Sequence, residues 1–205
     1  MMDRYHVAGA EGRFEPGSDG QVLANKQGIT DPSEMDTLEL ELLSELYDLV
    51  MGNDFPDRCL QVSDLKTWHR RWLGNVYCWA GQERSVNLSK GDFTFAAAAQ
   101  IPTLLEQFER NYLHRLTPCH ELDDQALVDA ITTTHVEFIL IHPFREGNGR
   151  LGRLLADVMA AQAGRGVLDY SGWNTDRNAY FAAIQHGLNG DYGPMRALVQ
   201  GALCL

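Results

Sequence analysis

The chain reads His142-Pro143-Phe144-Arg145-Glu146-Gly147-Asn148-Gly149-Arg150-Leu151-Gly152-Arg153 between two stretches with helical periodicity. Residues 126–139 and 151–159 both place apolar side chains three or four positions apart, which predicts two amphipathic helices. The segment between them holds three arginines, a glutamate and a histidine, a composition that a hydrophobic core does not accommodate. We therefore expect two packed helices joined by a loop that carries chemistry.

The glycine-rich part of this loop is suited to binding an anion. Gly147, Asn148 and Gly149 run directly into the second helix, where free backbone N–H groups and the positive end of the helix dipole attract negative charge. Arg150 and Arg153 are three residues apart and therefore neighbours on the first turns of that helix. These features predict a cradle for a polyphosphate.

Two other side chains of the loop add reactive chemistry. Glu146 offers the hard carboxylate oxygen that Mg²⁺ prefers, so it could hold a cation that bridges phosphate oxygens. His142 could accept a proton from an incoming hydroxyl group. Together these residue types indicate attack of a hydroxyl group on a nucleotide phosphate.

Two other nucleotide-binding motifs overlap the loop. Residues 147–152 match G-x-G-x-x-G, and Asp169 lies near the distance expected of a ribose-binding acid. The preceding residues have helical periodicity, however, so a βαβ dinucleotide-binding unit is not supported. The same residues resemble the start of a P-loop, but Arg153-Leu154 stands where Lys-Ser/Thr is needed, which removes the hydroxyl ligand for Mg²⁺.

The rest of the chain predicts further helices, and hence an all-α, mainly helical fold. A helix start at Asp31-Pro32-Ser33-Glu34 precedes apolar residues at helical spacing as far as Leu49. The acidic residues between them are expected to face water. Other helices are predicted at residues 63–74, 101–112, 180–188 and 194–203.

One hairpin interrupts this helical pattern. Residues Val86–Phe95 alternate in twos around Lys90-Gly91-Asp92, which predicts two short strands and a tight turn with an exposed edge. Residues 1–21 are rich in glycine and lack periodicity, and they predict an irregular N-terminal arm.

The charge of the chain limits its partners. The formal net charge of −11 excludes a protein that binds DNA or RNA, or an anionic membrane, over its whole surface. Nine acids lie within residues 31–57, which hold no Lys or Arg; a solvated helix face and a docking surface for a basic partner both fit this pattern. The chain has neither a leader pattern nor an apolar run near the roughly 18 residues of a membrane span, so we expect a cytoplasmic protein.

The loop segment resembles the signature of the Fic family, of the type His-Pro-Phe-x-Asp/Glu-Gly-Asn-Gly-x-x-x-Arg, at every defined position. Residues Tyr77–Arg84 are similar to the Trp-Ala-Gly segment that precedes the flap of this family, and Asn25–Asp31 resembles its lead-in. The resemblance therefore covers a Fic domain over residues 22–205, with a flap at 86–95 and a catalytic loop at 142–153. The arrangement also resembles the subgroup called mobile mystery protein B.

The resemblance implies a Fic-type helical fold that transfers AMP from ATP to a Ser, Thr or Tyr hydroxyl of a target protein. It assigns His142 as the base that deprotonates the hydroxyl, Phe144 as the inward anchor of the loop, and Glu146 as the ligand of Mg²⁺ between the α- and β-phosphates. Gly147, Asn148 and Gly149 would form the anion nest, with Asn148 toward the α-phosphate. Arg150 and Arg153 would meet the outer phosphates.

The resemblance also implies where the other substrates lie. The target segment would add as a strand to the flap residues Val86, Asn87, Leu88, Ser89, Lys90 and Gly91. Asn178 and Tyr180 resemble positions beside the adenine, although the helical spacing of Tyr180 fits a core residue equally well. His135 is expected to be a satisfied core histidine, and no partner is identified for His69.

The sequence lacks the inhibitory motif Ser/Thr-x-x-x-Glu-Gly/Asn that many Fic proteins carry. Glutamate precedes glycine only at Glu11, which has Val7 four residues earlier, and at Glu146 of the loop itself. The expectation is a bacterial toxin-type enzyme that a separate small antitoxin protein inhibits in trans.

Two alternatives remain beside AMP transfer. The first is a Doc-like kinase that transfers the γ-phosphate, but such loops replace the second glycine of Gly-Asn-Gly, which is Gly149 here. The second is a non-catalytic nucleotide-binding interaction module. The presence of His142 with Glu146 and Arg153 argues against this module, because binding alone needs no base.

Overall fold

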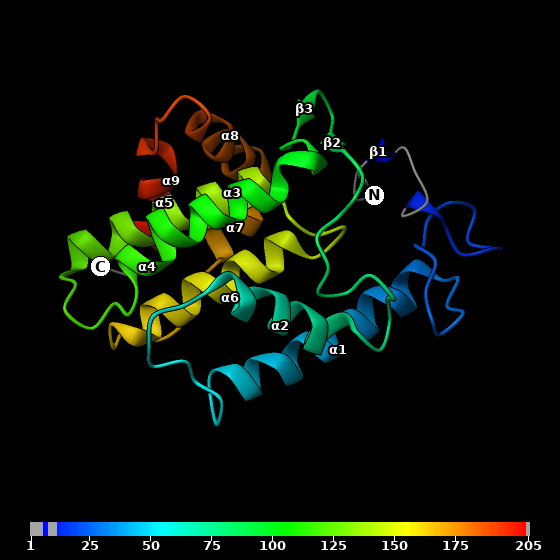
Figure 1. The fold of residues 1–205 in the computed structure, drawn as a ribbon, viewed down its shortest axis with the longest axis horizontal. Helices are drawn as coiled ribbons and strands as arrows, with labels where there is room; N and C mark the ends of the chain where they lie inside the picture. Colours follow the sequence, from blue (N-terminus) through cyan, green and yellow to red (C-terminus); the bar gives the residue numbers. More distant parts are fainter. Residues whose placement is uncertain (1–5, 8–11, 204–205) are drawn as a thin grey trace.

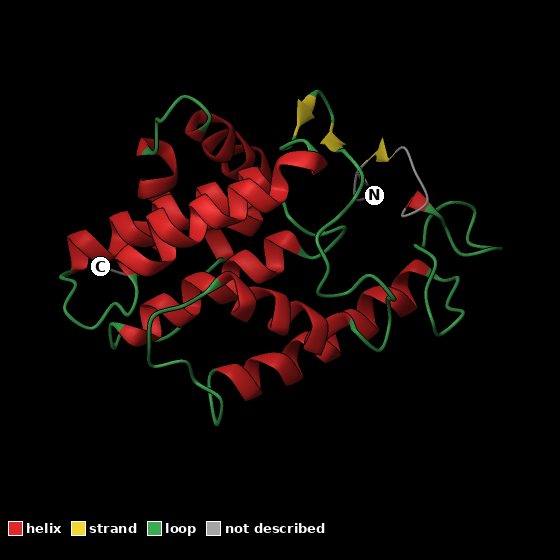
Figure 2. Ribbon diagram, in the orientation of Figure 1, coloured by secondary structure: helices red, strands yellow, loops and turns green. Residues whose placement is uncertain are grey.

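The computed structural model describes residues 6–7 and 12–203, and this part of the chain is mainly helical (Figures 1 and 2), which confirms the predicted fold class. The longer helices are α1 (Pro32–Val50), α2 (Val62–Leu73), α3 (Ile101–Phe108), α5 (Asp124–Ile141), α6 (Asn148–Gln162), α8 (Arg177–Gly187) and α9 (Gly193–Ala202). The short ones are η2 (Ala98–Gln100), the π-helical η3 (Glu109–Leu113), α4 (His114–Leu116) and α7 (Ser171–Thr175). Among the described helices, none has the length and apolar character that a membrane crossing requires.

Helix α5 is the centre of the bundle. It packs against α3, α6, α8 and α9, and it has buried residues on all of its sides, as expected of a core helix. Helix α6 packs on α5 and on α2, and α2 packs on α1. Figure 1 shows α5 and α6 crossing the middle of the molecule, with α1 and α2 below them. The loop between α5 and α6 is therefore anchored in the core at both ends.

The predicted helix start at Asp31 is confirmed. The Asp31 side chain accepts a hydrogen bond from the Glu34 N–H at 2.9 Å, and Pro32 occupies the first helical position. Asp123 caps α5 in the same way by accepting from the Ala126 N–H at 2.8 Å. Each cap satisfies a backbone donor that has no partner within its helix, so it fixes where the helix begins.

One prediction for the helices needs correction, and one short helix was not predicted. Leu188 was expected on the apolar face of the helix at 180–188, but it follows the end of α8 and is exposed. Helix α7 was not predicted, because its five residues are too few to show a period; it buries Trp173 against the core.

The expectation that every acid of α1 faces water is wrong for Glu39. This residue is only 4% exposed. Its carboxylate accepts hydrogen bonds from the Tyr77 hydroxyl and from the Arg150 guanidinium, both at 2.7 Å. These two donors replace the water that the buried carboxylate loses. Helix α1 is therefore tied to the first turn of α6 by an ion pair between the buried Glu39 and the partly exposed Arg150.

The predicted hairpin is confirmed, and a third strand lies beside it. Strands β2 (Leu88–Lys90) and β3 (Phe93–Thr94) are antiparallel. Strand β1 (His6–Val7) pairs antiparallel with β2, with His6 opposite Ser89 and Val7 opposite Leu88, so the order is β1-β2-β3. The edge of β2 that was predicted to be exposed is thus covered by the N-terminal arm, whose residues 1–5 and 8–11 lie outside the described part of the chain.

His135 is a core histidine, as predicted. Its Nδ1 donates to the Gly152 carbonyl at 3.2 Å, which leaves Nε2 to accept from the Tyr180 hydroxyl at 2.9 Å. Burial lowers the pKa of His135 to about 4. The folded protein therefore keeps this imidazole neutral at pH values where the unfolded chain begins to protonate it.

We predict that His135 makes the folded state less stable as the pH falls. Between its ordinary pKa of 6.5 and about 4, the unfolded chain binds more protons than the folded one, so the free energy of unfolding decreases as the pH decreases. His135→Phe should be less stable than the unchanged protein at pH 7.5, and the difference should shrink by about 2 kcal/mol at pH 5. Urea titrations followed by circular dichroism measure both curves; parallel curves would contradict the assignment.

Candidate active site

The candidate active site is built on the short turn between α5 and α6. Helix α5 ends at Ile141, and His142 follows in the left-handed region with φ 51° and ψ 59°. Helix α6 begins at Asn148 after Gly147, which also has a positive φ of 82°. These two backbone conformations reverse the chain within a few residues. They bring the predicted base and the predicted anion nest to one end of the two central helices.

The His142 imidazole is held as a neutral base. Its Nδ1 donates to the Ile139 carbonyl at 3.1 Å, so Nε2 is the basic nitrogen. The residue is 2% exposed, and its ring stacks on Phe95 of the flap with centroids 3.8 Å apart. Burial, together with the charges of Arg84 and Lys90, lowers the pKa of His142 to about 3. The base predicted from the sequence is thus unprotonated at neutral pH and lies directly beneath the flap.

The side chain of Asn148 closes the turn. Its Oδ1 accepts from the Phe144 N–H at 2.9 Å, and its Nδ2 donates to the Phe144 carbonyl at 2.8 Å. Phe144 is buried. The resemblance directed Asn148 toward the α-phosphate, but its side-chain amide is used within the loop. Its backbone N–H lies in the first turn of α6, where it has no partner within the helix. The placement of Asn148 toward the α-phosphate stays a prediction.

His69 holds the other side of the loop, a role that the sequence did not reveal. Its Nδ1 accepts from the Gly81 N–H at 2.8 Å, and its Nε2 donates to the Glu146 carbonyl at 3.1 Å. The ring stacks on Phe144 with centroids 4.0 Å apart. Burial lowers the pKa of His69 to about 4, so it is neutral and can accept and donate at once. No local pattern predicts such partners, because they come from the Trp-Ala-Gly segment and the catalytic loop.

Glu146 presents a carboxylate that fits one ligand of Mg²⁺. Its Oε1 accepts from the Gly147 N–H at 2.9 Å, and 30% of the side chain is exposed. Within the described residues, no group of three or more Cys, His, Asp or Glu could hold a metal by itself. One carboxylate with further oxygens from phosphates and water is a usual environment for Mg²⁺, so the donor set fits a cation that arrives with a nucleotide.

The two arginines of the helix differ in their surroundings. Arg150 donates to the buried Glu39 carboxylate and lies 4.6 Å from the centroid of the Trp72 ring. Arg153 donates to the Asn174 side chain at 3.0 Å and lies over the Tyr170 ring. No carboxylate within the described residues forms an ion pair with Arg153. Arg153 is therefore the more available cation for a phosphate.

The two glycines of the nest have different roles. A Cβ on Gly147 would lie 2.6 Å from the Trp72 ring, and its φ is positive, so glycine is required by the fold. A Cβ on Gly149 would meet no protein atom within 4 Å. The space beside Gly149 lies at the N-terminus of α6, where an anion would bind.

The flap covers the His142 end of the loop. Val86, Leu88 and Phe95 form a small apolar cluster to which Phe93 and Phe181 add, and Lys90 Nζ lies 3.8 Å from the centroid of the Phe181 ring. The other predicted flap residues are Asn87, whose Oδ1 accepts from the Ala98 N–H at 2.9 Å, Ser89, which pairs with both neighbouring strands, and Gly91, which has a φ of 57° in the turn. The hairpin is thus fastened to α8 through side chains.

The two residues predicted beside the adenine are placed differently. Asn178 is exposed in the first turn of α8. Tyr180 is buried; its hydroxyl bonds to His135, and its ring stacks on Trp173 at 5.2 Å. Arg153 lies 5.9 Å from the centroid of the same Trp173 ring. Tyr180 is therefore a core residue that packs on Trp173, the ring near which Arg153 lies. Its contact with adenine stays a prediction.

Solved structures share this arrangement of bundle, hairpin and loop, which is the Fic fold. The BepC protein of Bartonella tribocorum with bound AMPPNP matches with a TM-score of 0.71, over 88% of this chain and 91% of that chain at 22% identity. The N-terminal Fic domain of a Bartonella effector protein from Bartonella sp. AR 15-3 matches with a TM-score of 0.75, over 97% and 93% at 19% identity.

Sequence comparison gives the family. Residues 59–160 match the Fic/DOC family. The "Probable protein adenylyltransferase y4lH" of Sinorhizobium fredii is 29% identical over 87% of this chain and 90% of its own length. "Protein adenylyltransferase VbhT" of Bartonella schoenbuchensis is 29% identical over 75% of this chain, which spans only 32% of VbhT. The chain carries a domain of the Fic/DOC family. The resemblance to the mobile mystery protein B subgroup stays a prediction.

We predict that Gly149→Ala lowers the affinity for nucleotide without lowering the stability of the fold. Alanine is a better helix former than glycine by about 1 kcal/mol, and its Cβ meets no protein atom, so the melting temperature should stay or rise. The same methyl group would enter the space expected for phosphates, and the affinity for Mg-ATP should fall at least tenfold in calorimetric titrations.

Two further glycines serve as controls. Gly201→Ala in α9 also has open space around its Cβ and should leave nucleotide affinity unchanged. Gly147→Ala should instead lower the melting temperature, because of its positive φ and the Trp72 contact. Unchanged affinity in Gly149→Ala would place the phosphates elsewhere.

Proposed function

We propose that the protein is a protein adenylyltransferase that transfers AMP from ATP to a Ser, Thr or Tyr hydroxyl of a target protein. The observation that carries this proposal is the turn between α5 and α6, which unites a neutral His142 with the Glu146 carboxylate and the N-terminus of α6. The names of the curated relatives and the AMPPNP bound to the BepC structure support it. Cytosolic action in a bacterium is part of the proposal.

The chemistry follows from the positions of these groups. The Nε2 atom of His142 takes the proton of the target hydroxyl while its oxygen attacks the α-phosphorus. The bond from that phosphorus to the β-phosphate oxygen breaks, and pyrophosphate leaves. The reaction is mainly one of positioning and charge neutralisation, which suits a site with few reactive side chains.

Each protein group around the phosphates has its own proposed role. The backbone N–H groups of Asn148 and Gly149 and the dipole of α6 receive negative charge. Glu146 would hold Mg²⁺, which neutralises phosphate charge when bound. We assign the outer phosphates first to Arg153, because Arg150 would have to leave its ion pair with the buried Glu39. Phe144 and His69 keep the loop in place.

The flap is proposed to receive the target segment as an added strand. Strand β2 has β3 on one side and β1 on the other, so a target strand would take the position of His6–Val7. Main-chain pairing of this kind selects little for side chains, which suits a docking site whose specificity lies elsewhere.

Inhibition in trans by a separate antitoxin also belongs to the proposal. The sequence has no inhibitory motif, and no described carboxylate pairs with Arg153, the last residue of the signature. A glutamate supplied by a partner protein could therefore reach Arg153.

The test of AMP transfer uses ATP labelled at either the α- or the γ-phosphate. We predict that the protein with Mg²⁺ and a bacterial lysate transfers label to protein only from the α-position. His142→Ala should reduce the rate at least 100-fold, since general base catalysis typically contributes 10² or more, and EDTA should abolish transfer. Transfer from the γ-position would support the Doc-like kinase, and nucleotide binding without transfer would support the interaction module.

A second experiment tests the role of the arm. We predict that a chain lacking residues 1–11 labels its targets faster than the full chain with the same affinity for Mg-ATP, because β1 no longer occupies β2. His142→Ala in the shortened chain is the control for chemistry at the same site. Equal rates would contradict docking at this edge. A full chain that is wholly inactive until it is shortened would contradict inhibition by a separate antitoxin.

A further inference from the structure

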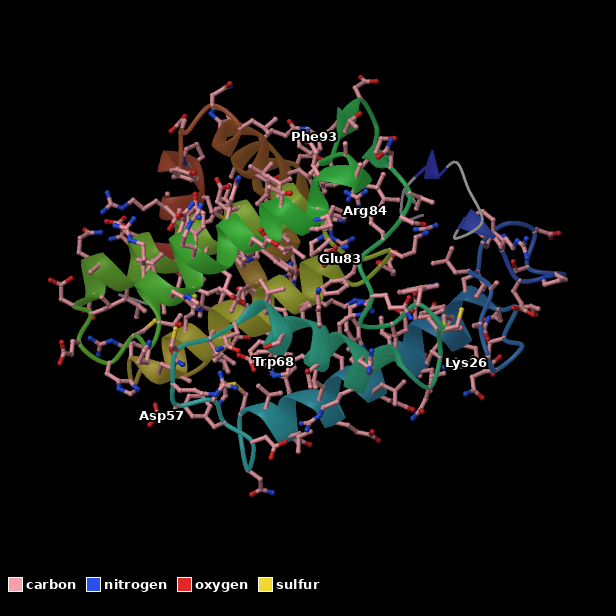
Figure 3. The ribbon with its side chains drawn as sticks, viewed as in Figure 1. Lys26, Asp57, Trp68, Glu83, Arg84 and Phe93 are labelled. Atoms are coloured by element: carbon pink, nitrogen blue, oxygen red, sulfur yellow. The ribbon has the colours of Figure 1, made fainter. Side chains whose placement is uncertain are left out.

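Arg84 is a buried cation between the flap and the catalytic loop. It is 2% exposed and lies two residues before the hairpin segment Val86–Phe95. In the view of Figure 3 it lies between Glu83 and Phe93, which belongs to β3. Its Nε donates to the His142 carbonyl at 2.7 Å, and its NH1 donates to the Val86 carbonyl at 2.6 Å. Its NH2 donates to the Ala96 carbonyl at 2.6 Å and to the Ile141 carbonyl at 3.3 Å.

These acceptors belong to two separate parts of the site. Val86 and Ala96 flank the hairpin, one on each side, whereas Ile141 and His142 are the last residue of α5 and its cap. Two backbone hydrogen bonds join the same two parts of the site. The backbone N–H of Arg84 donates to the Pro143 carbonyl, and that of Ala96 donates to the Leu140 carbonyl. One guanidinium group therefore joins both stems of the flap to the residue that carries the base.

The chemistry of this contact requires arginine. The carbonyls at the end of a helix lack partners within the helix, and a cation there interacts favourably with the dipole. The planar guanidinium group directs several donors in fixed directions, whereas a lysine ammonium acts as a compact point charge. A lysine at position 84 could not bond to the two stems and to His142 at once.

The contact also supports an unfavourable backbone conformation. His142 has a positive φ of 51°, which is uncommon for a residue with a side chain. The Arg84 Nε bond to the His142 carbonyl, the Nδ1 bond to Ile139 and the stacking on Phe95 all hold it there. The flap itself has independent contacts, through its apolar cluster and through Lys90 on Phe181. Arg84 is thus needed less for forming the hairpin than for setting its place relative to His142.

We propose that Arg84 is a positioning residue that fixes the target-docking strand β2 relative to His142. The proposal rests on the proposed function in that β2 receives the target. It names a residue outside the catalytic loop that acts through the main chain of His142 and of the flap. Its loss would misalign hydroxyl and base and leave the phosphate cradle intact.

The experiment compares Arg84→Lys and Arg84→Ala with a matched control in the full chain. Gln162→Ala removes another buried polar clamp, which bonds to the carbonyls of Pro56 and Arg58 and to the Cys119 N–H at the far end of α6. We expect both Arg84 variants to bind Mg-ATP within about twofold of the unchanged protein, and to label the target from α-labelled ATP at least tenfold more slowly. Gln162→Ala should lose stability and keep the labelling rate per folded molecule.

A second measurement does not depend on the target. In the Arg84 variants, exchange of the backbone amide hydrogens of residue 84 and of Ala96 should become faster while α5 and α6 stay protected. In proteins with ¹⁵N-labelled histidine, the ring signals of His142, assigned by their absence in His142→Ala, should shift. Added guanidinium ion should partly restore the labelling rate of Arg84→Ala.

Each outcome decides between the alternatives. Slower labelling with normal ATP affinity and altered exchange at the flap stems supports the positioning role. Unchanged exchange and unchanged His142 signals would overturn it, as would a loss of ATP affinity equal to the loss of labelling. If the unchanged protein transfers no label, the proposed function fails, and the exchange and histidine signals still decide whether Arg84 couples the flap to His142.

Discussion

The side chain of Asn148 is the constraint on which the site depends. By bonding to both the N–H and the carbonyl of Phe144, it closes the turn between the two central helices. A closed turn keeps His142 at the end of α5 and the free N–H groups at the start of α6 within one short loop. Because α5 and α6 are packed on several sides, both ends of the loop are held in place by the closely packed core. This is the kind of preorganised polar site that charge stabilisation requires.

Buried polar groups surround this turn, and each has partners that offset its lost hydration. His69 and His135 stay neutral and use both ring nitrogens. Glu39 pairs with Arg150, and Arg84 bonds to backbone carbonyls of the flap and the loop. A buried charge or imidazole without such partners would be costly. The same partners therefore stabilise the fold and limit where the flap and the arginines can lie.

The sequence predicted the elements whose signals are local. A cap at Asp31 predicted the start of α1, apolar spacing predicted α1, α5 and α6, and alternation around Lys90-Gly91-Asp92 predicted the hairpin. Strand β1 and helix α7 escaped prediction because a few residues show no period. Glu39 was misassigned for a different reason: its charge is compensated by Tyr77 and Arg150, which are distant in the chain. Spacing along one helix carries no information about such partners.

The sequence by itself determined the helical class of the fold and the position of the loop between α5 and α6, because both are encoded by residue order over short distances. It predicted His142, Glu146 and Arg153 as site residues through their types and spacing, and their roles stay predictions. Only the tertiary structure decided that the Asn148 side chain bonds to Phe144 within the loop and that Arg150 pairs with Glu39. It also decided that Arg84 and His69 donate hydrogen bonds to carbonyl groups of the loop. These contacts join segments far apart in the chain, and they form because a buried polar group without a partner is costly, so most such groups find one nearby in space.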